Sequence, residues 1–290
     1  MPMLRLGPFL LLFFGLGRIV SPTACAGRGA SSRRACRALG RQLLDFRAGY
    51  DTNLLGQGMS TGWVVRTPAD VLGVLNDAEM LHAPRELYLR GNLALLALGP
   101  RVSVIGSREA SDPGLSRARS LARVLVQHDV LVVSGLAAGI DTAAHQGTMD
   151  AGGHTVAVLG TPVDQAYPRE NADLQAQIAA GHLLVSQFAP GTPIAPRNFP
   201  MRNRTMALLT DATIIVEASE RSGTVYQGWE ALRLGRSLFL LENVATDPRL
   251  TWPARMISSG AQVISRVNLE QTLADLRAPK ARAAPSGSAD

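Results

Sequence analysis

The stretch VLVVSGLAAGIDTAAH, residues 130–145, decides how this chain folds. It begins with a short apolar run, passes through a loop of glycines and small side chains, and continues with helical spacing. An apolar run without polar alternation is typical of a strand that is buried on both faces, as strands of parallel sheets are. One strand–loop–helix unit of an α/β protein is therefore predicted here.

The same unit recurs on both sides of this stretch. Apolar strand runs are predicted at 102–105, 130–133, 155–159, 183–186, 213–216, 238–241 and 262–264. Helical segments are predicted at 115–127, 141–151, 171–180, 205–209, 224–234 and 269–276. Strands and helices that alternate with short connections make right-handed crossovers. The predicted fold class is α/β, a doubly wound and mostly parallel sheet of the extended Rossmann-like type.

Changes in composition divide the 290 residues into four segments. Residues 1–58 are predicted to be poorly ordered, signal-like or mis-started. Residues 59–92 form a short helical lead-in, in which Thr67 caps the first helix. Residues 93–277 form the Rossmann-like domain, and residues 278–290 are predicted to be a disordered tail.

Residues 1–58 differ from the rest of the chain in charge and in cysteine content. They hold eight arginines and two aspartates, so they account for the whole formal charge of +6. Both cysteines also lie there, so the remainder can form neither a disulfide framework nor a thiolate metal site. Any nucleic acid must therefore be held by a local cluster of arginines and not by a general positive field.

Three interpretations of the N-terminal segment are open. A basic start at Arg5, an apolar run over 6–16 and small residues around Cys25 are typical of a secretory signal peptide. The apolar run could instead form a helix that packs on the main domain. The third interpretation, which we favour, is that translation starts at Met59, because charge, composition and cysteine usage all change there. The protein is then cytoplasmic, and no apolar run is long enough to predict a membrane span.

Small residues follow the predicted strands at the edge where doubly wound sheets bind ligands. Gly106, Ser107 and Arg108 follow the first strand, and Ser222 and Gly223 come after the fifth. Small side chains let a backbone approach a phosphate, helix N-termini supply N–H donors, and arginine binds phosphate bidentately. These loops predict an anion-binding edge, although Arg108 by itself fits an ordinary surface residue better.

Two glycines, Gly135 and Gly139, flank the loop that precedes the second helix. Asp141 and His145 follow one helical turn apart and share a face. They could act as an acid and a base. A structural role, in which Asp141 caps the helix and His145 fixes the loop, is favoured because no nucleophile, third acid or metal cluster accompanies them. We predict no catalytic residue, no metal and no cofactor.

Arginines and one aromatic ring gather in residues 197–204. Arg197, Phe199, Arg202 and Arg204 combine guanidinium groups with a phenyl ring. Single-stranded nucleic acid is bound in this way, with phosphates on the guanidinium groups and a base stacked on the ring. The alternative is that Phe199 is a core residue and that Arg202 or Arg204 pairs internally with Asp211 or Glu217.

Taken in order, these motifs resemble the DNA-processing protein DprA (Smf) family. They are Gly106-Ser107-Arg108, SGLAAGIDTAAH at 134–145, TVAVLG at 155–160, Tyr167-Pro168, FPMRNR at 199–204, and Val216-Glu217-Ala218 with Ser222-Gly223. The resemblance covers roughly residues 85–265. It implies a homodimeric protein without established chemistry that binds and protects single-stranded DNA and loads a RecA-type recombinase.

The resemblance also implies which residues contact DNA. Arg108 matches the family's motif arginine, and FPMRNR supplies Phe199, Arg202 and Arg204. Arg197 lies near the basic residue that precedes this block. Pocket-forming loop positions are matched by Gly106, Ser107, Gly135, Gly139, Ser222 and Gly223.

The chain departs from the family pattern at Gln227-Gly228, where the family has Thr-Ala, and at Glu242-Asn243, where it has Pro-Gly. A second hypothesis is a nucleotide-processing enzyme, because the related LOG-type phosphoribohydrolases carry P-G-G-x-G-T-x-x-E. Ser222-Gly223-Thr224 followed by Glu230 is similar, but the paired glycines are missing and the glutamate lies three residues too late to reach the same ribose. A mononucleotide-sensing module is a third hypothesis.

Overall fold

The computed structural model describes residues 62–277, and the segments 1–61 and 278–290 lie outside the described residues. The predictions made for the N-terminal segment before Met59 and for the C-terminal tail therefore fall outside it. The strands of the described part are β1 (Val64–Arg66), β2 (Leu87–Gly91), β3 (Arg101–Gly106), β4 (Leu131–Ser134), β5 (Thr155–Leu159), β6 (Leu183–Ser186), β7 (Ala212–Glu217), β8 (Ser237–Leu241) and β9 (Gln262–Ile264).

These strands form one sheet in the order β1-β2-β6-β5-β4-β3-β7-β8-β9. From β6 to β9 every neighbouring pair is parallel. All seven predicted strands are present, and the doubly wound α/β fold is confirmed. The central strands β4 and β5 are buried at every position, as their unbroken apolar runs indicate.

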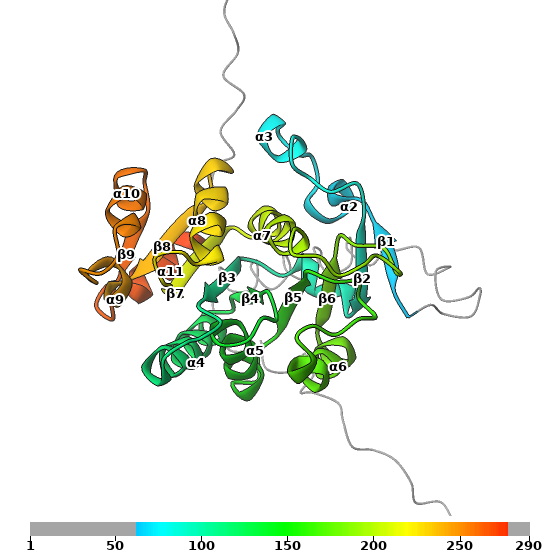
Figure 1. The fold of residues 1–290 in the computed structure, drawn as a ribbon, viewed down its shortest axis with the longest axis horizontal. Coiled ribbons are helices and arrows are strands. Elements are labelled where there is room, and N and C mark those ends of the chain that lie inside the picture. The colour runs from blue at the N-terminus through cyan, green and yellow to red at the C-terminus, as the bar shows by residue number, and fades with distance from the viewer. Residues whose placement is uncertain (1–61, 278–290) are drawn as a thin grey trace, which may run out of the picture. The chain divides into compact units, whose positions relative to one another are not determined.

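Helices cover both faces of the sheet (Figure 1). They are α2 (Pro68–Leu72), α3 (Asp77–Met80), α4 (Asp112–Gln127), α5 (Ile140–Asp150), α6 (Ala172–Gly181), α7 (Asn198–Leu209), α8 (Gly223–Arg233), α9 (Glu242–Ala245), α10 (Trp252–Ser258) and α11 (Leu269–Arg277), with 3-10 turns η3 (Leu93–Ala97) and η4 (Arg169–Asn171). Helices α4, α5 and α11 share one apolar core with the sheet, and α2, α7, α8 and α10 share the core of the opposite face. None of the helices within 62–277 is long and apolar enough to cross a membrane.

The lead-in contains the expected short helices but also two strands that the sequence did not indicate. Thr67 caps α2 as predicted, because its hydroxyl accepts from the Asp70 amide and its own amide donates to the Asp70 carboxylate. Strand β2 pairs antiparallel with both β1 and β6 and extends the sheet at one edge. Leu87 and Leu89 are buried while Tyr88 is not, so buried and more exposed side chains alternate along β2. The alternating run is too short for the strand to be predicted from the sequence.

Helix α7 begins seven residues before the predicted helix at 205–209. It starts at Asn198 and includes all of FPMRNR, which was expected to be an exposed binding segment. Pro200 lies in the first turn of α7, where a missing amide hydrogen removes no intrahelical bond. The proline therefore does not interrupt the helix, and the block of arginines has a helical periodicity.

The topology places a crevice beyond the carboxyl ends of β3 and β7. From β3 the chain proceeds outward through β4, β5 and β6, and then returns to β7 on the other side of β3. Loops leaving β3 and β7 therefore diverge to opposite faces of the sheet. In open α/β sheets such a switch point is where ligands bind.

Candidate nucleic-acid interface

A cavity of about 600 Å³ opens at this switch point. It is bounded by the loops after β3 and β7 and by the first turns of α5, α7 and α8. The residues that line it and carry the argument below are Gly106, Ser107, Arg108, Asp141, Tyr167, Phe199, Arg202, Asn203, Ser222, Gly223, Thr224, Tyr226 and Gln227. Seven of the eleven predicted DNA-binding residues are in this set.

Arg108 and two aromatic rings form one wall of the cavity. The exposed Arg108 places its Cζ atom 5.1 Å from the centre of the Phe199 ring. The Tyr167 and Phe199 ring centres are 5.2 Å apart. Gly160 leaves room for this wall, since a Cβ there would lie 2.7 Å from the Phe199 ring. A flat apolar surface thus lies next to a solvated cation.

Gly139 allows the β4–α5 loop to pack closely against the loop after β3, which carries Arg108. Its φ angle is +75°, and a Cβ would lie 2.3 Å from the carbonyl oxygen of Ser107. The next amide, that of Ile140, donates to the same oxygen over 3.1 Å. The residue must therefore be glycine both for its backbone angle and for the close approach.

The N-terminus of α8 forms the opposite wall. Ser222 caps this helix, because its hydroxyl accepts from the Thr224 amide. The Thr224 hydroxyl donates to the carbonyl of Gly106 over 3.0 Å and so ties α8 to the end of β3. A helix N-terminus directed at a cavity favours bound anions.

Arg202 is buried, contrary to the expectation that it would be an exposed phosphate ligand. Only 4% of it is exposed. Its Nη1 donates to the carbonyl of Val158 over 2.8 Å and also to the carbonyl of Gly135, while its Nε donates to the Asn203 side chain. The arginine is held by groups of β5 and the β4–α5 loop, because α7 turns it inward.

Asp141 lies beside Arg202 and holds the same loop from the other side. Its Oδ2 accepts from the amides of Gly135 and Ala137 over 3.2 and 3.4 Å. The expected helix cap is not present, since Gly139 is the N-cap of α5 and no side chain caps it. Burial raises the pKa of Asp141, against the opposing effects of Arg202 and the amide hydrogen bonds. Burial likewise lowers the pKa of Arg202, and Asp141 opposes that shift.

His145 is fully buried and does not line the cavity. The Thr155 hydroxyl donates to the Val132 carbonyl, so it accepts from His145 Nδ1 over 2.7 Å. Nε2 is then the unprotonated nitrogen, and burial lowers the pKa of His145 to about 3. The histidine joins α5 to β5 and has the geometry of a structural residue.

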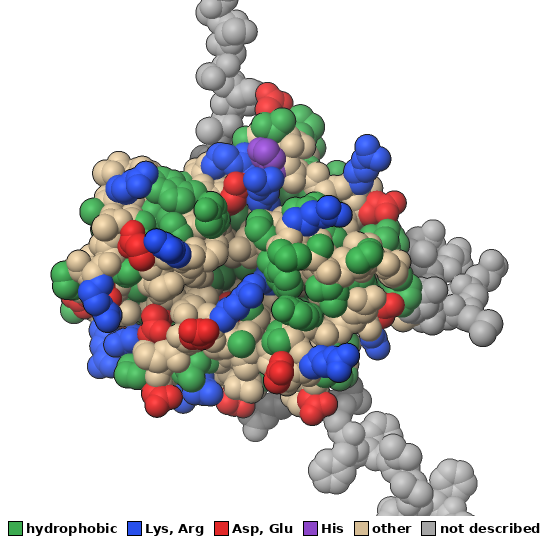
Figure 2. Space-filling view, in the orientation of Figure 1, with side chains coloured by type: hydrophobic (Ala, Val, Ile, Leu, Met, Phe, Trp, Pro, Cys, Tyr) green, Lys and Arg blue, Asp and Glu red, His purple; other side chains and the backbone are tan. Residues whose placement is uncertain are grey.

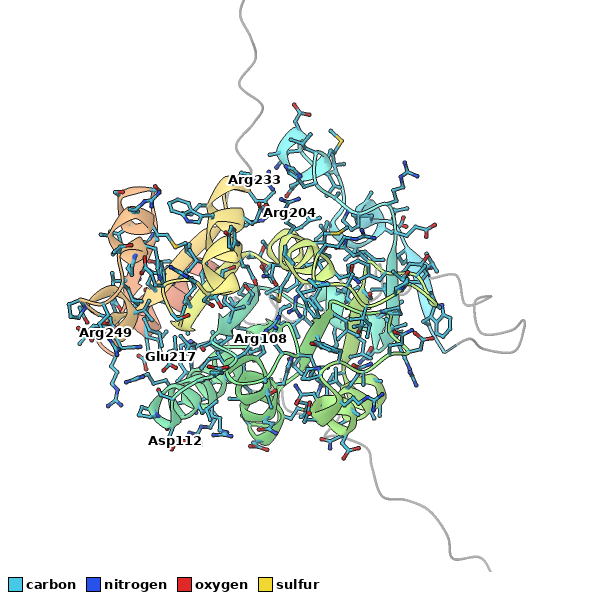
Figure 3. The ribbon with its side chains drawn as sticks, in the orientation of Figure 1. Arg108, Asp112, Arg204, Glu217, Arg233 and Arg249 are labelled. Atoms are coloured by element: carbon cyan, nitrogen blue, oxygen red, sulfur yellow. The ribbon has the colours of Figure 1, made fainter. Side chains whose placement is uncertain are left out.

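Arg197 and Arg204 do not join the cavity. Arg197 is exposed ahead of α7. Arg204 points toward α8, where it forms an ion pair with Glu230 at 3.4 Å, and Glu230 also pairs with Arg233 at 2.6 Å (Figure 3). Arg204 is thus in an ion pair, but its partner is Glu230 and not Asp211 or Glu217 as the alternative supposed. Glu230, the acid of the phosphoribohydrolase hypothesis, is engaged in these pairs and is not a cavity residue.

Other lining residues were not predicted as site residues. Tyr167 was noted only as part of a motif, and Tyr226 extends 72% exposed at the start of α8. Thr224 and Gln227 are three residues apart, so they present the same face of α8 to the cavity. This helical spacing after Ser222 is the signal that could have identified them.

The visible surface is not uniformly basic. Figure 2 shows basic side chains dispersed among acidic and apolar ones and no single basic patch on this face. Arg108 lies near the middle of the same view in Figure 3, apart from Arg204 and Arg249. Among the described residues that line the cavity, only Arg108 and Arg202 are basic.

This geometry defines a Rossmann-like α/β protein with a ligand cavity at its switch point. The family model of DNA recombination-mediator protein A matches residues 74–276. The chain belongs to this family, the DprA (Smf) family.

Several relatives illustrate the similarity. The DNA processing protein DprA of Streptococcus pneumoniae is 38% identical over 190 residues, which are 65% of this chain and 66% of the relative. That of Bacillus subtilis is 33% identical over 181 residues, covering 62% of this chain and 61% of the relative. The chain thus spans less than two thirds of the length of either relative.

Two solved structures are also similar. DprA of Streptococcus pneumoniae superposes with a TM-score of 0.63 at 32% identity, covering 73% of this chain and 74% of that one. DprA of Helicobacter pylori superposes with a TM-score of 0.62 at 25% identity, covering 75% of this chain and all of that one. The latter structure concerns the single-stranded DNA binding mode of the Helicobacter protein.

Proposed function

We propose that this protein binds single-stranded DNA at the switch-point cavity. The observation that carries the proposal is the wall in which the solvated guanidinium of Arg108 lies over the ring of Phe199. An unpaired strand offers phosphates and bare base faces side by side, and this wall has a partner for each. The single-stranded DNA binding of the Helicobacter pylori relative supports the proposal.

The parts of the cavity have separate tasks. Arg108 and the N-terminus of α8 at Gly223 hold phosphate at the rim. Phe199 and Tyr167 offer faces on which a base stacks. Arg202 and Asp141 position the β4–α5 loop and do not reach the strand, because their polar groups are turned toward main-chain atoms.

Family membership supports a broader role. We propose that the protein acts in the cytoplasm without a catalytic step, protects single strands during DNA uptake and recombination, and assists the loading of a RecA-type recombinase as a homodimer. Arg197 and Arg204 lie outside the cavity, so in this proposal they contact phosphates of a strand that continues beyond it.

Arg108→Ala tests the binding site. We expect this variant of the full chain to bind a labelled single-stranded oligonucleotide about tenfold more weakly by fluorescence anisotropy, because a charge-assisted contact to phosphate is lost. The slope of log affinity against log salt should fall by about 0.7 for the lost phosphate.

Arg123→Ala is the matched control, since Arg123 is an exposed arginine of α4 that does not line the cavity. It should bind as the unaltered protein does. Equal affinities for all three proteins would overturn the proposed site.

A further inference from the structure

Arg108 lies in a loop of five residues, 107–111, between the end of β3 and the start of α4. The proposed function requires this exposed guanidinium to stay at the rim of the cavity, beside the ring of Phe199. Ordering an exposed loop costs conformational entropy, so other segments must hold its ends. Glu217, the last residue of β7, contacts both ends of this loop (Figure 3).

The first end of the loop is held by the main chain of Glu217. Gly106 and Glu217 are the last residues of the neighbouring strands β3 and β7 and are paired with each other. The Ser107 amide then donates to the Glu217 carbonyl over 2.7 Å. This bond extends the contact between the two strands by one residue into the loop. The chain therefore leaves the sheet in a fixed direction immediately before Arg108.

The second end of the loop is held by the side chain of Glu217. The Ser111 amide donates to Glu217 Oε1 over 2.8 Å, and the Ser111 hydroxyl donates to Oε2 over 2.6 Å. The same hydroxyl accepts from the Gly114 amide and so caps α4. An ionised carboxylate can accept both bonds at once, and hydrogen bonds to a charged group are stronger than neutral ones. One side chain thus fixes the end of the loop and the first turn of the next helix.

Gly114 leaves the space that the Glu217 carboxylate occupies, because a Cβ at this position would overlap Oε2. Glu217 does not line the 600 Å³ cavity. Together with Ser111 it borders a neighbouring cavity of about 570 Å³. Within residues 62–277 it forms no ion pair with Arg108. Glu217 therefore supports the loop from the side that faces away from the proposed strand.

The negative charge of Glu217 does not by itself explain why an acid stands next to a DNA site. A carboxylate repels a polyanion, so a residue that acted through its charge alone would weaken DNA binding. The hydrogen bonds to Ser111 give the carboxylate another role, because they order the loop before the strand binds. A loop that is already ordered loses less conformational entropy on binding.

We propose that Glu217 is a positioning residue for DNA binding: by holding Ser107 and Ser111, it fixes the loop that presents Arg108 to phosphate. This inference rests on the proposed function and adds how the arginine is kept in place. A residue that acts only through Arg108 cannot contribute more to binding than Arg108 does. The loss of its side chain should therefore weaken binding by less than the roughly tenfold expected for Arg108→Ala.

Glu217→Met tests the proposal in the full chain, because methionine keeps the length of the side chain but accepts no bond from Ser111. We expect it to bind a labelled single-stranded oligonucleotide about fivefold more weakly by fluorescence anisotropy. Glu217→Gln retains one acceptor oxygen and should recover most of the affinity. The two variants have the same charge, so the difference between them reports the hydrogen bonds.

Ser111→Gly removes the hydroxyl from the other side of the same contact. Glycine is tolerated at a helix N-cap, so this variant should fold even if Glu217→Met does not. We expect it to bind the oligonucleotide about threefold more weakly. If Glu217→Met does not fold, unchanged affinity of Ser111→Gly overturns the inference.

Glu220→Met is the matched control. Glu220 lies three residues after Glu217, and its carboxylate accepts from the amide and the hydroxyl of Thr251 in the same way. These bonds hold the segment before α10 instead of the Arg108 loop, and Glu220 does not line the 600 Å³ cavity. The control loses the same charge and the same two kinds of hydrogen bond. It should bind the oligonucleotide as the unaltered protein does.

A double-mutant cycle distinguishes positioning from a general loss of stability. When Arg108→Ala is already present, Glu217→Met should cause no further loss of affinity, because the loop then has no guanidinium to present. A general loss of stability would instead weaken binding by the same factor with or without Arg108.

The outcomes separate this inference from the proposed function. Unchanged affinity of Glu217→Met, or an equal loss with and without Arg108, overturns the inference and leaves the DNA site in place. Tighter binding by Glu217→Met also overturns it, because the carboxylate would then act through its charge. If Arg108→Ala binds the oligonucleotide as the unaltered protein does, the proposed site itself fails.

Discussion

Arg108 and Arg202 show how differently two arginines of one cavity can be used. Arg108 is exposed and lies over an aromatic ring, whereas Arg202 is buried and bonded to carbonyls of Gly135 and Val158. A buried guanidinium that has lost its hydration depends on such partners. Arg202 therefore contributes to the stability of the domain more than to direct DNA contacts.

Arg202→Met should lower the free energy of unfolding by about 3 kcal/mol or more, because it leaves Asp141 buried without its neighbouring charge and strands two carbonyls. Chemical denaturation measures this loss. Arg204→Met is the control: Arg204 is exposed and its ion pair within residues 62–277 is with Glu230, so the change should be below about 1 kcal/mol. Similar stabilities for the two variants would contradict the assignment of Arg202 as a buried structural residue.

At the level of elements, the cavity depends on how closely loops approach one another. The β4–α5 loop passes over the loop after β3 at Gly139, and α8 is tied to the end of β3 by Thr224. Phe199 and Arg202 lie three residues apart on one face of α7 and both line the cavity, but the guanidinium of Arg202 is buried and bonded to main-chain carbonyls. The block FPMRNR therefore contributes both to the lining of the cavity and to packing.

Gly139→Ala should be clearly more destabilising than Gly152→Ala. Both glycines have φ near +75°, where an L residue is strained, so each substitution carries a backbone cost of about 1 kcal/mol or more. A Cβ at Gly139 would also press against the Ser107 carbonyl, while one at Gly152 would meet nothing within 4 Å. Thermal unfolding of the two variants gives the comparison. Equal losses of stability would show that the β4–α5 loop can move away from the loop after β3 without an energetic cost.

Gly139→Ala should in addition weaken oligonucleotide binding, because the loop it displaces carries Arg108. Gly152 lies at the far end of α5 and is not a lining residue, so its variant should bind normally once folded.

At the scale of the whole molecule, stability should depend on pH through His145. The folded protein keeps this histidine neutral because burial lowers its pKa to about 3 from an ordinary 6.5. Below pH 6.5 the unfolded chain takes up a proton that the folded chain does not, so stability falls as the pH decreases from 6.5 toward 3.

We expect the unfolding free energy to drop by about 2 kcal/mol between pH 7.5 and 5 on account of this residue. His145→Asn retains a donor near Thr155 but does not titrate, so its stability should vary less over the same range. The lowered pKa of His182 affects both proteins and cancels in the comparison. If the unfolding free energies of the two proteins changed equally with pH, the prediction would be contradicted.

The lead-in belongs to the same folded body. Strand β2 pairs with β6, and Glu79 of α3 forms an ion pair with Arg236 next to β8. This contact joins residues far apart in the chain. No local sequence pattern predicted these contacts, because an ion pair or an outer strand depends on which distant residues the tertiary fold places next to it.

Much of the fold could be predicted because its signals are local. The parallel strands follow from unbroken apolar runs, and the start of α2 follows from Thr67 and Pro68. The start of α7 was missed, since a proline in a first turn looks like a break until the helix around it is known. The strand β2 was missed because three alternating residues carry too little periodicity.

The amino-acid sequence by itself determined the strand–helix alternation, the edge of the sheet at which the cavity lies, and the family. These depend on the order of residues and on short spacings. Only the tertiary structure decided which arginine is exposed, which is buried and which is paired. The reason is physical: the partners of Arg202 and Arg204 are carbonyl and carboxylate groups from distant segments, and only the packed fold brings them within hydrogen-bonding distance.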